Sequence, residues 1–154
     1  MPKRNYMGGA LETITIYTDG AARGNPGESA SGFAVYDGSG RLRKSHSAYN
    51  GTNTNNYAEY RAVILALQWC KNNLKSPRSA DIELYSDSQL VVRQLTGMYK
   101  VKAPAMAEMN RAVVVLAGIF RSVRFHNVPR EHEGIRYVDA RLNELLDRKE
   151  QEKG

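Results

Sequence analysis

The sequence is short of cysteine, of long apolar runs and of acidic residues. Cys70 is the only cysteine, so no disulfide can form within the chain, and we expect this residue to be buried in a protein of the reducing cytoplasm. The longest apolar run, residues 112–120, lies between two arginines and is too short to span a bilayer, so no membrane association is expected. No apolar segment follows the charged residues near the N-terminus, which argues against a signal peptide.

Basic residues outnumber acidic ones, 22 to 16, and the formal net charge is +6. Such a balance favours a polyanionic partner such as nucleic acid. With 154 residues the chain can bury a core without disulfides. We expect one catalytic domain over residues 13–150, a flexible arm over 1–12, a frayed tail over 151–154, and a monomer.

The hydrophobic pattern predicts an α/β fold whose elements follow the order strand, strand, strand, helix, strand, helix, helix, strand, helix. Short turns join the first three strands, which should be antiparallel, whereas helical crossovers lead to the last two, which should run parallel to the first. The result is a five-stranded mixed sheet with helices on both faces. The expected strands are 13–18, 31–37, 41–49, 81–86 and 122–128, and the expected helices are 56–73, 88–96, 105–117 and 137–150.

Four carboxylates are the candidate catalytic residues. Asp19 and Asp87 each follow an apolar strand, and the carboxyl ends of parallel strands meet at the edge of a sheet where ligands bind. Glu59 shares a helical stripe with apolar residues and should therefore face inward. Asp139 shares a face of the last helix with two leucines. We therefore expect four acids from four elements to point toward one place.

Each acid also has an ordinary alternative. Asp19 could cap the following turn, Asp87 could cap the helix that starts at Ser88, and Glu59 and Asp139 could each neutralise a helix N-terminus. Four clustered carboxylates would repel one another, and a divalent cation relieves that repulsion. Oxygen ligands suit magnesium or manganese, and two such ions about 3.5–4 Å apart support phosphoryl displacement. The residues together predict metal-dependent chemistry on a phosphodiester.

Two polar segments lie near these acids. The glycine-rich run 20–27 lacks the Gly-Lys-Ser/Thr ending of a nucleotide-binding loop, and we interpret it as a tight loop that lets a nucleic-acid backbone approach. Residues 50–56 form a polar loop in which Thr54 or Asn55 can cap the next helix. From the residues alone, a solvated turn is the preferred explanation of that loop.

The blocks TDGAARGNPG, TNTNNYAEYRAVILAL, YSDSQLVVRQLTG and VDARLNELLD together resemble type 1 ribonuclease H over about residues 14–147. The resemblance implies a five-stranded mixed sheet and cleavage of the RNA strand of RNA–DNA hybrids, with 5′-phosphate and 3′-hydroxyl ends. It further implies that Asp19, Glu59, Asp87 and Asp139 bind two Mg²⁺ ions, with Mn²⁺ as an alternative metal.

The resemblance also assigns substrate contacts. Asn25, Asn55, Asn56 and Gln89 match positions that contact minor-groove base edges and ribose 2′-hydroxyls, the groups by which RNA is told from DNA. Thr54 matches a residue that binds a phosphate of the DNA strand.

Two departures from the family pattern concern basic residues. Many members carry a basic, Trp-rich protrusion, but the corresponding segment here is short, with Lys100 and Lys102 beside Tyr99. The family often has a catalytic histidine before the last acid; His132 is the candidate, and Arg130 is a second candidate for electrostatic help. Two alternative functions stay open: a nuclease of the same fold that cuts double-stranded RNA, and a non-catalytic hybrid-binding module, against which the four intact acids argue.

Overall fold

The computed structural model describes residues 11–153, so most of the predicted N-terminal arm lies outside the described residues. Five strands and four α-helices follow one another in the predicted order. They are β1 (Glu12–Arg23), β2 (Gly27–Tyr36), β3 (Leu42–Asn53), α1 (Asn55–Asn73), a short 3₁₀ helix (Pro77–Ser79), β4 (Ala80–Ser86), α2 (Gln89–Leu95), α3 (Pro104–Ala117), β5 (Ser122–Asn127) and α4 (Glu133–Lys153).

The five strands form one mixed sheet in the order β3-β2-β1-β4-β5. Short turns join β1, β2 and β3, which pair antiparallel. Helical crossovers separate β4 and β5 from the strands that they join, and both strands run parallel to β1. The predicted fold class is confirmed.

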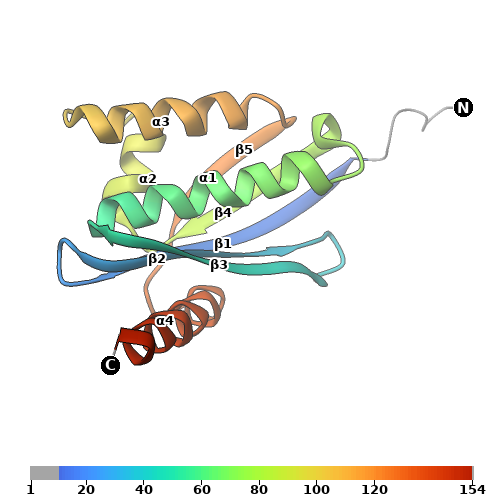
Figure 1. Cartoon of the computed structure of the whole chain (residues 1–154). Helices are drawn as coiled ribbons and strands as arrows, with labels where there is room; N and C mark the ends of the chain where they lie inside the picture. Colours follow the sequence, from blue (N-terminus) through green and yellow to red (C-terminus); the bar gives the residue numbers. More distant parts are fainter. Residues whose placement is uncertain (1–10, 154) are drawn as a thin grey trace, which may run out of the picture.

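Helices cover both faces of the sheet, with α1, α2 and α3 on one side and α4 on the other (Figure 1). Successive side chains of a strand point to opposite faces of the sheet, so β1 contributes side chains to two hydrophobic cores. The larger core, on the side of α1 to α3, includes Ile14, Ile16, Val63, Leu67, Cys70 and Leu84. The smaller core, under α4, consists of Ala30, Ala34, Val138, Leu142 and Leu146. Cys70 is buried as predicted, and burial raises the pKa of its thiol to about 12.

Several predicted boundaries were wrong, including the start of β2, which begins at Gly27 instead of residue 31. β1 does not end at Asp19 but continues to Arg23, because its pairing with β2 runs on without interruption. β3 likewise continues to Asn53, which reduces the predicted polar loop 50–56 to a single residue before α1. The last helix begins at Glu133 instead of 137 and reaches Lys153, so residues 151–153 are helical where a frayed tail was expected.

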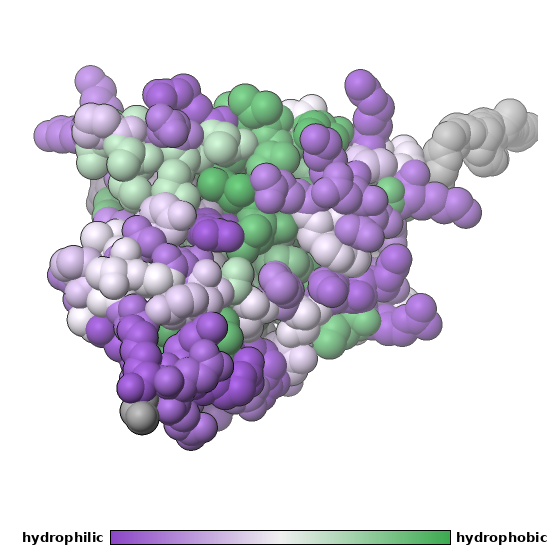
Figure 2. Space-filling model, in the orientation of Figure 1, coloured by the Kyte–Doolittle hydropathy of each residue, from purple (hydrophilic) through white to green (hydrophobic). Residues whose placement is uncertain are grey.

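The described helices contain no segment that is both long and apolar enough to cross a membrane. Figure 2 shows instead that hydrophilic side chains cover the lower part of the molecule, over the C-terminal end of α4.

Candidate metal centre

The site begins with a close contact between β1 and α1. A side chain at Gly20 would place its Cβ 2.4 Å from the backbone of Ala58 and Glu59, a distance that only glycine avoids. Gly20 is therefore part of a strand that passes directly against the helix, not of a turn as its sequence context suggested. This contact places Glu59 of α1 beside Asp19 of β1.

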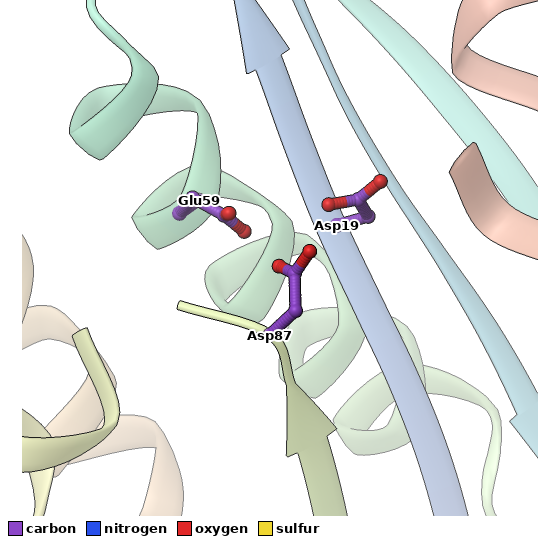
Figure 3. Close-up of side chains that lie close together, drawn as sticks. All are labelled: Asp19, Glu59 and Asp87. Carbon is purple, nitrogen blue, oxygen red and sulfur yellow. The ribbon is translucent and has the colours of Figure 1, made fainter. Parts of the chain in front are cut away.

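Three acids meet where β1, α1 and the end of β4 come together. Asp19, Glu59 and Asp87 each offer a carboxylate oxygen, and these oxygens all lie within 4.8 Å of one another. Figure 3 shows the three side chains projecting toward a common space from the strand, the helix and the end of β4. Asp19 is 4% exposed and Glu59 is 9% exposed. The prediction that Glu59 faces inward is confirmed.

Burial and mutual repulsion dominate the electrostatics of the three acids. Burial, together with the negative charges of Asp87 and Asp139, raises the pKa of Asp19 to about 8. Burial and the charges of Asp19 and Asp87 hold the pKa of Glu59 well above its usual range. The pKa of Asp87 is also raised, chiefly by burial, although the charge of Arg130 opposes the shift. Without a compensating cation, these carboxylates therefore bind protons more readily than exposed carboxylates do.

The donor atoms fit a hard divalent cation. Among the described residues, the buried oxygens Glu59 Oε1 and Asp87 Oδ1 have no hydrogen-bond partner. Buried polar atoms without partners are costly, and a cation that accepts oxygen ligands would satisfy both. Carboxylate oxygens are the ligands that Mg²⁺ and Mn²⁺ prefer.

The fourth acid lies at the same cleft but outside the three-residue group. Asp139, on α4, lines a cleft of about 520 Å³ together with the three acids. It comes after the first turn of α4, so it does not neutralise the start of that helix. The ordinary role considered for Asp87 is also excluded, because the side chain of Ser88 caps α2.

Two of the predicted substrate residues line this cleft, and a third supports them. Asn55 and Asn56, at the start of α1, lie beside the acids. The Asn25 side-chain oxygen accepts a hydrogen bond from the backbone N–H of Asn55 at 3.1 Å. The Asn55 side-chain oxygen in turn accepts one from the N–H of Ala22 at 2.9 Å. The turn after β1 is therefore joined to the edge of the cleft.

The remaining two predicted substrate residues lie outside the cleft lining. Thr54 is exposed, and its hydroxyl accepts a hydrogen bond from the N–H of Tyr57 at 3.1 Å, which makes it the N-cap of α1. Gln89 is exposed at the start of α2. Both remain available to a large ligand that extends beyond the acids.

The two candidates for electrostatic help lie in different places. Arg130 lines the cleft, with its Nε 3.8 Å from Asp87 Oδ2, and its side chain is 84% exposed. His132 lines a neighbouring hollow, where its ring centre lies 5.2 Å from that of Tyr17. Its Nδ1 accepts a hydrogen bond from the N–H of Gly134 at 3.1 Å. The imidazole therefore supports the start of α4, and Arg130 is the cation nearer to the acids.

Comparisons with known proteins match most of this chain to a family. The profile of the RNase H family matches residues 11–148. Ribonuclease HI of Halobacterium salinarum is 39% identical over 135 residues, which are 87% of this chain and 64% of the relative. A bifunctional protein of Mycobacterium tuberculosis is 35% identical over 136 residues, and the chain spans only about 35% of that protein's length.

Solved structures agree with the sequence matches. LC11-RNase H1, isolated from compost, superposes with a TM-score of 0.83 at 36% identity, over 90% of this chain and 99% of the other. The same protein has been solved in complex with an RNA/DNA hybrid; that structure gives a TM-score of 0.81 at 37% identity and covers 88% and 98% of the two chains.

Proposed function

The chain belongs to the RNase H family, and from that membership we propose that it is an endonuclease that hydrolyses the RNA strand of RNA–DNA hybrids. One observation supports this most strongly: three buried carboxylates converge at an open cleft, and two of their oxygens lack a hydrogen-bond partner among the described residues. The related LC11-RNase H1 has been solved with an RNA/DNA hybrid, which supports the same substrate class here.

We assign the metal to the four acids of the cleft. Asp19, Glu59 and Asp87 would hold Mg²⁺, or Mn²⁺ in its place, and Asp139 would complete a site for two ions. When bound, two such ions would activate a water and stabilise charge at the scissile phosphate, and hydrolysis of the P–O3′ bond would leave 5′-phosphate and 3′-hydroxyl ends.

The other residues of the cleft would bind and orient the hybrid. Asn55 and Asn56 line the cleft, and we assign them to base edges and 2′-hydroxyls of the RNA strand, with Asn25 holding Asn55 through a hydrogen bond. Thr54 and Gln89 are exposed nearby for the flanking parts of the substrate. Arg130 adds a positive charge beside Asp87, where a phosphate would enter. One chain supplies all of these groups, and we propose that it acts as a monomer.

The test is cleavage of a labelled RNA–DNA hybrid with Mg²⁺ and with EDTA. We expect cleavage only with the metal, and we expect Asp87→Asn to lower kcat by about 100-fold or more, because a ligand of the metal is lost. Glu108→Gln removes an exposed carboxylate of α3 and should leave the rate unchanged.

An inactive wild-type protein in Mg²⁺ would refute the enzyme assignment, and full activity of Asp87→Asn would refute the metal site. A double-stranded RNA substrate is run alongside the hybrid. Equal cleavage of both would broaden the substrate class, whereas hybrid binding without cleavage would indicate a binding module.

A further inference from the structure

The C-terminal end of α4 contacts β1 next to the turn that leads into β2. Arg23 is the last residue of β1, and its guanidinium lies 2.8 Å from Asp147 Oδ1 and 2.7 Å from Glu150 Oε1. It also donates a hydrogen bond to Asn143 Oδ1 at 2.9 Å. One half-buried guanidinium is thus held by three acceptors from successive turns of the helix.

The other strand of the same hairpin is held by the same helix. Glu28 of β2 is the residue that pairs with Arg23 across the hairpin. Its carboxylate accepts hydrogen bonds from Lys153, the last residue of α4, and from the hydroxyl of Tyr49. The ammonium of Lys149 lies 4.8 Å from the centre of the Tyr49 ring. The end of α4 therefore contacts both strands on either side of the turn.

The far side of this turn is joined to the cleft. Asn25, within the turn, accepts the N–H of Asn55, and Asn55 accepts the N–H of Ala22. In Figure 1 the turn between β1 and β2 and the C-terminal end of α4 lie at the same end of the sheet. The turn thus links the end of α4 to the start of α1, where Asn55 lines the cleft.

Part of these contacts lies outside the residues that the family profile matches. The RNase H profile matches residues 11–148, whereas Glu150 and Lys153 lie past that range. The C-terminal end of α4 supplies one partner to each strand of the hairpin: Glu150 to Arg23, and Lys153 to Glu28.

We propose that the last turns of α4, residues 143–153, position the β1–β2 turn so that Asn25 and Asn55 meet the RNA strand in the orientation that binding requires. Arg23, Asp147 and Glu150 are positioning residues in this arrangement, since they act through the turn and not on the substrate. The inference rests on the proposed function, because it concerns how that function's substrate is bound.

The direction of the change in KM distinguishes this positioning role from a general effect of charge on binding. Asp147→Asn combined with Glu150→Gln removes two negative charges from a basic protein, which by itself would strengthen binding to a polyanion and lower KM. Loss of positioning would raise KM instead. Since each exposed ion pair contributes modestly, we expect the double variant to raise KM for hybrid cleavage by about 3- to 10-fold with kcat within about twofold.

Glu144→Gln is the matched control. Glu144 lies on the same helix and forms an ion pair with Arg141 at 2.9 Å, away from the hairpin. The Glu144→Gln substitution removes a negative charge without releasing the turn, so KM should stay the same or fall. A second measurement follows amide hydrogen exchange without substrate, and the N–H of Asn55 should exchange faster in the double variant than in the control.

An unchanged or lowered KM in the double variant overturns the inference, and so does a lower melting temperature without a change in KM, which would show a role in stability alone. If wild-type protein cleaves the hybrid while the variants match it, only the positioning role is refuted. If wild-type protein does not cleave the hybrid at all, the proposed function is refuted and this inference with it.

Discussion

In Asp19, burial and repulsion by neighbouring negative charges act on the same carboxylate. It is 4% exposed, faces two other acids, and has its pKa raised to about 8. An unfolded chain releases this proton at far lower pH, near the ordinary value of 3.8. Between these two values the folded protein binds more protons than the unfolded one, so the stability of the metal-free protein falls as pH rises.

Replacing this carboxylate tests that conclusion. We expect Asp19→Asn to raise the free energy of unfolding of the metal-free protein at pH 8 by about 1–3 kcal/mol, because an amide has no charge to bury. At pH 4 the two proteins should be about equally stable. Urea unfolding in EDTA measures both values, and an identical pH dependence of variant and wild type would contradict the prediction.

For single residues, the sequence identified the acids of the cleft but not which basic residue lies beside them. Glu59 and Asp87 follow from helical spacing and from a strand end, which are local patterns, whereas Asp19 was found through an expected strand end where β1 in fact continues. The place of His132 relative to Arg130 depends on how the chain enters α4, and no local pattern determines that. Gly20 had a readable signal, because a glycine inside a strand indicates the close approach of another backbone.

The segment that leads into α4 places His132 and Arg130 in different surroundings. His132 accepts the N–H of Gly134 and lies against Tyr17, whereas Arg130 lies at the cleft beside Asp87. The helix begins at Glu133, earlier than its apolar pattern indicated, and its first turn includes the buried residues Gly134 and Ile135.

A pair of variants distinguishes these roles. We expect Arg130→Gln to lower kcat for hybrid cleavage by about tenfold, since a positive charge near the phosphate is lost, and Arg130→Lys to recover part of it. His132→Ala should cost about 1 kcal/mol of stability, as loss of a helix cap does, and leave kcat within about twofold. Steady-state kinetics and thermal unfolding of the same samples measure both, and a large loss of kcat only in His132→Ala would reverse the assignment.

The order and direction of the elements were predictable from the sequence, whereas several of their boundaries were not. Alternation and helical spacing indicate the type of each element, and the crossover rule indicates which strands run parallel. The continuation of β1 through Asp19 to Arg23 depends on pairing with β2, which overrides the turn-forming residues that follow the acid.

For the whole molecule, net charge should govern affinity more than any single residue does. The chain has a formal charge of +6, and its segment 96–103 between α2 and α3 offers few basic residues in place of a protrusion. We expect KM for hybrid cleavage to rise about 10- to 100-fold between 50 and 200 mM salt, as for a ligand that makes about two to four phosphate contacts. Kinetics across a salt series measures this slope, and a flat profile would contradict the electrostatic role.

The contacts of α4 with the sheet and with the end of β1 were beyond sequence-based prediction. Arg23 and Glu150 are 127 positions apart, and only the packing of α4 across the sheet brings them together. The smaller core that holds α4 there is equally non-local, since it joins two alanines of β2 to three apolar residues of the helix.

The position of α4 in the chain has a consequence for synthesis on the ribosome. It is the last element of the described fold, and it alone covers the face of the sheet that exposes Ala30 and Ala34. A nascent chain that has released β1 to β5 would therefore present an uncovered apolar sheet to the cell until residues 133–153 leave the exit tunnel. Folding of this domain is therefore completed only when α4 packs against the sheet and covers these apolar residues.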